Sequence, residues 1–70
     1  MIQVGLLTEQ QKNELVGQQY TANSYFNPIQ DTNDNWIISQ EEINYCDNED
    51  FLWIKNLPLI DFIPKPSFIL

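Results

Sequence analysis

The chain has 70 residues, enough for one small domain, and its 43% hydrophobic and 13% aromatic fractions are too high for a disordered protein. Ten carboxylates and three lysines give a formal net charge of −7, with no arginine or histidine, so nucleic acid and anionic membranes are not expected as partners because both are bound through clustered cations. The same absences remove the residues on which most hydrolase, kinase and metalloenzyme sites depend, so we expect a non-enzymatic protein without catalytic residues, cofactor or metal.

The first elements are a short apolar segment and a helix. Residues 1–7 are mostly apolar and predict a short strand or an anchoring arm. A capping box from Thr8 to Gln11 then predicts a helix that runs to about Val16, and Gly17 is placed to end it.

The middle of the chain predicts a β-hairpin. Residues 20–30 are aromatic and small polar, and Pro28 argues against a helix there. A dense turn signal at residues 31–35 is followed by the β-favouring run 36–38. The simplest arrangement is a hairpin over roughly residues 24–39.

A second capping box at residues 39–42 predicts a short helix that ends near Cys46. Cys46 has no cation nearby in the sequence to lower its pKa, so we expect a small buried hydrophobic residue rather than a redox site. Residues 51–54 are then expected to form a strand, residues 55–56 a turn, and residues 57–63 a further extended segment.

The last part of the chain is apolar and contains three prolines, which exclude a helix there. We therefore predict an α+β fold that forms a small single unit over residues 1–56, with a short N-terminal helix, a central β-hairpin and a short second helix. Residues 57–70 are predicted to follow it as an extended, proline-containing apolar arm.

The turn region also resembles the calcium loop of an EF-hand, with oxygen ligands at suitable spacing. The ligands would be Asp31, Asn33, Asn35, Ser39 and Glu42. Trp36 stands where the loop needs glycine, and Pro28 lies where the entering helix should run. A hairpin turn followed by a capping box explains the same residues without an ion, so we expect no metal and keep calcium as an alternative.

A run of carboxylates follows the second capping box. Its members are Glu41, Glu42, Asp47, Glu49 and Asp50. They could imitate the phosphates of DNA and occupy a basic cleft, or they could form a solvated polar face, which is the usual role of such a run.

The arm and one tryptophan supply candidate partner-binding residues, because aromatic and large apolar side chains dominate interface energies. These candidates are Trp53, Leu57, Leu59, Ile60, Phe62, Ile63, Phe68, Ile69 and Leu70. In so small a chain most other aromatic side chains are expected to belong to the core.

Residues 25–31, 35–39 and 41–42 together resemble short uncharacterised reading frames of tailed phages and prophages of gut Bacteroidetes, including the crAss-like group. In that pattern the turn often carries glycine, whereas this chain has Asp34. The resemblance covers a quarter to a third of the chain and implies a phage setting without an assigned activity.

These observations predict a phage structural or accessory protein that docks on a larger virion protein, such as capsid, portal or tail, by strand addition or groove filling. The chain lacks a disulfide framework, and small proteins of this kind often gain stability from a partner. The opening residues predict no secretion signal, so we expect synthesis in the host cytoplasm and a final place in the virion. The alternative function is a soluble acidic inhibitor of a host nucleic-acid-binding enzyme.

Overall fold

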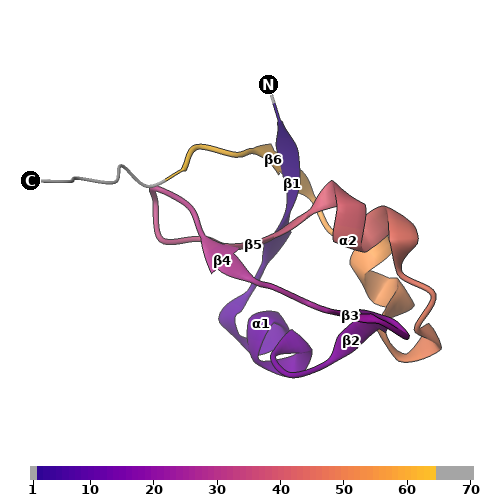
Figure 1. Ribbon diagram of the computed structural model, residues 1–70. Coiled ribbons are helices and arrows are strands. Elements are labelled where there is room, and N and C mark those ends of the chain that lie inside the picture. The colour runs from indigo at the N-terminus through magenta and orange to yellow at the C-terminus, as the bar shows by residue number, and fades with distance from the viewer. Residues whose placement is uncertain (1, 65–70) are drawn as a thin grey trace, which may run out of the picture.

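The computed structural model describes residues 2–64, and the central element of its sheet is the strand β1 (Gln3–Leu7) (Figure 1). β1 lies between β5 and β6 in an antiparallel sheet of order β4-β5-β1-β6. The neighbouring strands are β4 (Ile29–Gln30), β5 (Trp36–Ser39) and β6 (Leu59–Asp61). The predicted α+β class is confirmed, and residues 3–7 form a central strand rather than an anchoring arm.

The first helix, α1 (Glu9–Leu15), begins and ends close to the predicted positions. The Thr8 hydroxyl accepts a hydrogen bond from the Gln11 amide at 3.1 Å, and the Gln11 side chain accepts one from the Thr8 amide at 2.9 Å. Gly17 adopts a φ of 80°, a left-handed conformation that glycine reaches without strain. The capping box therefore accounts for the start of this helix, and the left-handed Gly17 for its end.

The predicted hairpin is shorter in the structure and is joined by a second one. Strands β2 (Gln19–Thr21) and β3 (Ser24–Tyr25) pair in a separate two-stranded sheet, whereas β4 pairs with β5. Pro28 lies between the two hairpins, outside the paired strands, so its lack of a backbone N–H costs no hydrogen bond between strands. The prediction of one hairpin over residues 24–39 is thus correct only for the β4–β5 part.

The second helix, α2 (Gln40–Tyr45), confirms the second capping box. The side chains of Ser39 and Glu42 each bond the backbone N–H of the other residue, at 3.3 Å and 2.9 Å. At the other end of α2, the Lys55 ammonium donates to the Ile43 carbonyl at 2.8 Å. The lysine thus satisfies one of the carbonyl groups that a helix end leaves without a partner.

The strand predicted at residues 51–54, with a turn at 55–56, is wrong. These residues belong to η1 (Glu49–Asn56), a 3-10 helix interrupted by a kink at Phe51. The Asn48 side chain accepts a hydrogen bond from the Asp50 amide at 3.1 Å, which caps its start. Burial also lacks the two-residue period of a strand, because Leu52 is 42% exposed whereas Ile54 is fully buried.

The main core lies between one face of the sheet, the helices and η1. Its buried members are Leu7, Leu15, Phe26, Ile38, Ile43, Cys46 and Ile54. α2 approaches β1 closely at Gly5, where an added Cβ would lie 2.7 Å from the Ile43 Cδ1 atom. Cys46 is buried, and the Phe26 ring packs against the rings of Tyr20 and Phe51 with centroids 5.5 Å apart in each pair, so both residues have the core role expected.

The extended segment predicted at residues 57–63 is present, but it packs on the chain's own sheet. The Leu6 amide donates to the Pro58 carbonyl at 2.9 Å, and the Phe62 amide donates to the Ile2 carbonyl at 2.8 Å. Residues 65–70, the rest of the predicted arm, lie outside the described residues.

Candidate functional site

The sheet has apolar side chains on both faces. Because side chains alternate along a strand, Gly5 and Ile38 point to the main core, whereas Val4 and Ile37 point to the opposite face. We call this second face the open face. Val4 and Ile37 are buried although they lie outside the main core cluster.

The segment that follows β6 connects the two edges of the sheet on the side of the open face. After β6 the chain continues to the β4–β5 turn, where the Thr32 amide donates to the Ile63 carbonyl at 2.8 Å. Figure 1 shows this segment and the β4–β5 hairpin closing a ring with β1 and β5. Phe62 is thereby placed on the open face near Ile2.

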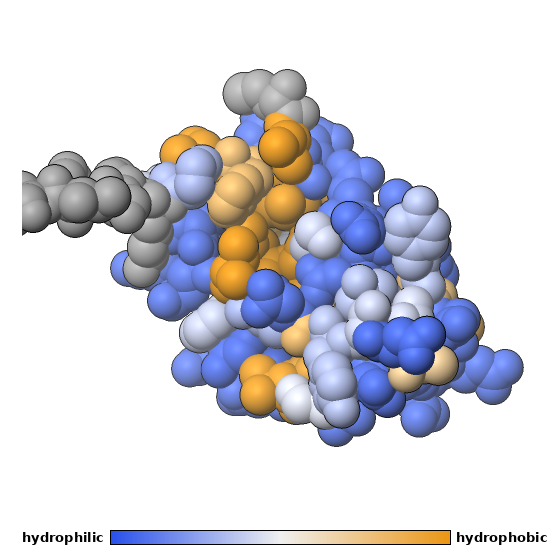
Figure 2. Space-filling view, viewed as in Figure 1, coloured by the Kyte–Doolittle hydropathy of each residue, from blue (hydrophilic) through white to orange (hydrophobic). Residues whose placement is uncertain are grey.

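A pit of about 270 Å³ lies on the open face. Its lining consists of Ile2, Val4, Asn27, Ile29, Ile37, Ser39, Glu42 and Phe62. We define the apolar patch as the five hydrophobic members of this lining. Figure 2 shows hydrophobic side chains gathering in this hollow, and two of them, Ile2 and Ile29, are 70% and 43% exposed.

One carboxylate, that of Glu42, lies in the wall of this largely apolar pit. The Glu42 side chain is only 7% exposed. Its Oε1 accepts a hydrogen bond from the Asn27 amide at 2.6 Å, and its Oε2 accepts from the amide and hydroxyl of Ser39 at 2.9 and 3.0 Å. The capping box thus fixes a charged group at the edge of the apolar patch.

The structure does not bring the five residues of the possible calcium loop together. The Asp31 carboxylate accepts hydrogen bonds from the amides of Asn33 and Asn35 at 2.8 and 2.9 Å, so it holds the hairpin turn. Glu42 lies beyond the other end of β5, a strand whose four residues span roughly 13 Å. Among residues 2–64, no group of three or more acidic, histidine or cysteine side chains is placed to hold a metal ion.

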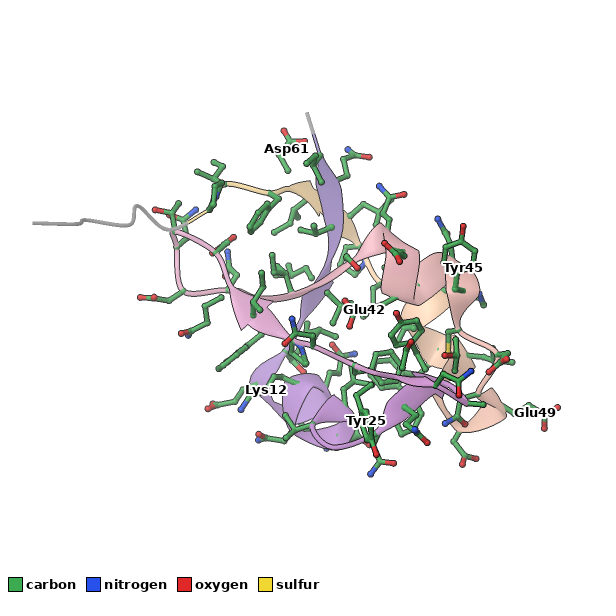
Figure 3. All side chains as sticks on the ribbon, viewed as in Figure 1. Lys12, Tyr25, Glu42, Tyr45, Glu49 and Asp61 are labelled. Atoms are coloured by element: carbon green, nitrogen blue, oxygen red, sulfur yellow. The ribbon has the colours of Figure 1, made fainter. Side chains whose placement is uncertain are left out.

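The acidic run divides into buried and exposed members. Glu41, Asp47, Glu49 and Asp50 are exposed, and Figure 3 shows Glu49 projecting outward from one end of the molecule. Glu42 is instead buried in the pit wall, apart from these exposed carboxylates. The described lysines are engaged elsewhere, since Lys12 lies 4.4 Å from the Trp36 ring centroid and Lys55 binds the end of α2.

The predicted partner-binding residues occupy different environments. Trp53 and Leu57 are half-buried and pack against the main core. Ile60 and Phe62 are also half-buried, whereas Leu59 and Ile63 are exposed. Phe68, Ile69 and Leu70 lie outside the described residues.

The prediction missed four members of the apolar patch, which are Ile2, Val4, Ile29 and Ile37. A signal for three of them was present in the sequence. Residues 2, 4, 5, 6 and 7 are apolar, and so is the whole run 36–38, so both strands carry apolar residues on two sides and need cover on both faces. The place of Ile29 in the patch could not be predicted, because its strand β4 has two residues and is too short to show a pattern.

A larger hollow of about 690 Å³ lies between the start of α1 and the end of η1. Half of its lining residues are polar or charged, and the lining comprises Leu6, Leu7, Thr8, Gln11, Glu14, Asn35, Trp53, Asn56, Leu57 and Pro58. The side chains of Gln11 and Asn35 are already hydrogen-bonded within the chain. The apolar patch is therefore the better candidate for a docking site.

Comparison with protein families, curated proteins and solved structures finds no match for this chain. The resemblance to phage reading frames is not tested by these comparisons and stays a prediction. Within residues 2–64, none of the helices has the length and apolar character needed to cross a membrane.

Proposed function

We propose that this chain is a non-enzymatic accessory protein that docks on a larger protein of a tailed-phage virion through its apolar patch. The observation that supports this function is the exposure of large hydrophobic side chains around the pit on the open face, namely Ile2 and Ile29. Grouped apolar side chains on the surface of a small protein are typical of interaction sites.

The charge of the chain favours a basic partner over a second copy of itself. Two copies would each bring a net charge of −7 to the contact, which opposes association. A partner that presents an apolar surface and carries a positive net charge complements the patch and avoids this repulsion. Phe68, Ile69 and Leu70, which follow Ile63 in the chain, are proposed to contribute to the same contact.

The first experiment compares two double variants that each remove two exposed large hydrophobic side chains. Ile2→Ser with Ile29→Ser removes the rim of the patch, whereas Val16→Ser with Tyr45→Ser removes exposed side chains outside the pit lining. We expect the patch variant to bind its partner at least about tenfold more weakly, because interface anchors typically contribute 1–2 kcal/mol each. The control variant should bind normally.

The measurement is quantitative mass spectrometry of proteins that copurify with the tagged chain from phage-infected cells, and of the chain in purified particles. A virion protein recovered with the wild type and the control, but lost with the patch variant, supports the proposal. Equal recovery with both variants, or no recovery with the wild type, counts against it. Deleting residues 57–70 is an unsuitable test because it removes β6 from the sheet.

The exposed carboxylates of Glu41, Asp47, Glu49 and Asp50 favour the acidic inhibitor as a second candidate function. Salt separates the two functions, because exposed charge pairs are screened whereas apolar contacts are not weakened by salt. A partner bound through the acidic face should dissociate between low and physiological ionic strength. A partner bound through the patch should lose far less affinity over the same range, because Glu42 is the one carboxylate in the pit lining and its burial reduces screening.

A further inference from the structure

We infer that the pit receives a lysine side chain of the partner, with its aliphatic stem against Val4 and Ile37 and its ammonium group at Glu42. This inference rests on the proposed function and names the chemistry that the same site recognises. Three properties of the pit support this inference: its size, its charge, and the number of hydrogen-bond positions that remain on Glu42.

The size of the pit suits one side chain. Sites for drug-sized ligands usually measure about 300–1,000 Å³, whereas this pit has about 270 Å³. Five of its eight lining residues are hydrophobic, and Val4 and Ile37 are buried. An unbranched aliphatic stem can therefore lie against the hydrophobic lining while its polar end reaches the wall, as long cationic side chains commonly do.

The charge of Glu42 favours a cation at this wall. A neutral apolar side chain would cover the carboxylate without compensating its charge, which is unfavourable in a site from which water is excluded. Lys12 and Lys55 do not provide the counter-charge, because their ammonium groups lie at Trp36 and at the end of α2. The counter-charge is therefore expected from the partner.

The hydrogen bonds of Glu42 favour lysine over arginine. A carboxylate has about four acceptor positions, two on each oxygen. Oε2 already accepts two hydrogen bonds from Ser39, and Oε1 accepts one from Asn27, so a single position remains on Oε1. An ammonium group needs only one such position, whereas a guanidinium fork binds best to two oxygens.

The test uses n-pentylammonium as a probe of the pit and n-pentanol as its uncharged counterpart. Methyl signals of Val4 and Ile37 are followed by NMR during titration of the full-length protein. We expect both signals to shift, with pentylammonium binding about tenfold more tightly than pentanol because it adds a partly buried ion pair.

Two glutamine variants check the role of the charge. Glu42→Gln should remove the preference for pentylammonium, while its amide oxygen can still accept a capping hydrogen bond, and Glu41→Gln should keep the preference because Glu41 is exposed. Equal binding of the two probes to the wild type overturns the inference even if Glu42→Gln does not fold. Absence of methyl shifts at the highest soluble pentylammonium concentration also overturns it.

Lys65→Ala tests a competing occupant from the chain itself. If pentylammonium binds only to this variant, the pit holds the chain's own lysine and the inference of a partner lysine is wrong.

The experiment with the two double variants tests the proposed function without using either probe, so its outcome is separate from that of the titrations. Loss of partner binding by the patch variant without selective pentylammonium binding would leave the proposed function standing and refute only the lysine.

Discussion

Ile54→Ala is expected to lower the free energy of unfolding by about 2–4 kcal/mol, whereas Leu52→Ala should change it by less than about 0.5 kcal/mol. Ile54 is fully buried in the main core, and truncating it leaves a cavity among Leu15, Ile38 and their neighbours. A domain of this size has a total stability of only about 4–10 kcal/mol, so the loss would be a large part of the whole.

Comparing Ile54→Ala with Leu52→Ala also tests whether these residues form the helical η1 or a strand. Residues 52 and 54 would point to the same side of a strand and should then respond alike to truncation. In η1 one of them is exposed and the other is buried. Urea denaturation followed by circular dichroism measures both variants, and equal losses of stability would contradict the helical assignment.

Asp31→Ala is the second substitution with a large expected effect, again a loss of about 2–4 kcal/mol. The Asp31 carboxylate is 2% exposed and accepts hydrogen bonds from the amides of Asn33 and Asn35, and from the Asn35 side chain at 3.3 Å. Alanine would leave these donors without their acceptor, and donors that lose a buried partner are costly.

The control for Asp31→Ala is Asp47→Ala, which changes the net charge by the same amount at an exposed position. Its expected effect on the melting temperature is small, because exposed substitutions rarely change stability by more than about 0.5 kcal/mol.

Calcium should not raise the melting temperature of the wild type, since the Asp31 carboxylate already accepts the hydrogen bonds of the turn. A calcium-dependent rise that Asp31→Ala abolishes would restore the calcium loop as a correct interpretation.

The features predicted well from the sequence depend on neighbouring residues. Both capping boxes join residues three apart, so Thr8 with Gln11 and Ser39 with Glu42 were readable without tertiary information. The turn before β5 was equally local, because the carboxylate of Asp31 binds backbone amides within four residues.

The features that were missed depend on contacts between distant residues. Residues 51–54 are large and apolar like a buried strand, but a cap at Asn48 and packing in the main core determine their helical conformation. The pit arises only when β6 pairs with β1 and Phe62 reaches Ile2, which no local pattern reports. For the same reason Trp53 was expected at an interface, although its ring packs 6.4 Å from that of Phe51.

The position of β1 has a consequence for how the protein is made. β1 is central in the sheet, and its register pairs Gln3 with Asp61, which lies far along the chain. β1 therefore leaves the ribosome before β6 has been synthesised, and its apolar residues lack one of their two neighbouring strands until then. Pairing over such a sequence separation is slow compared with helix formation, so the sheet is expected to be completed only after residues 59–61 have emerged.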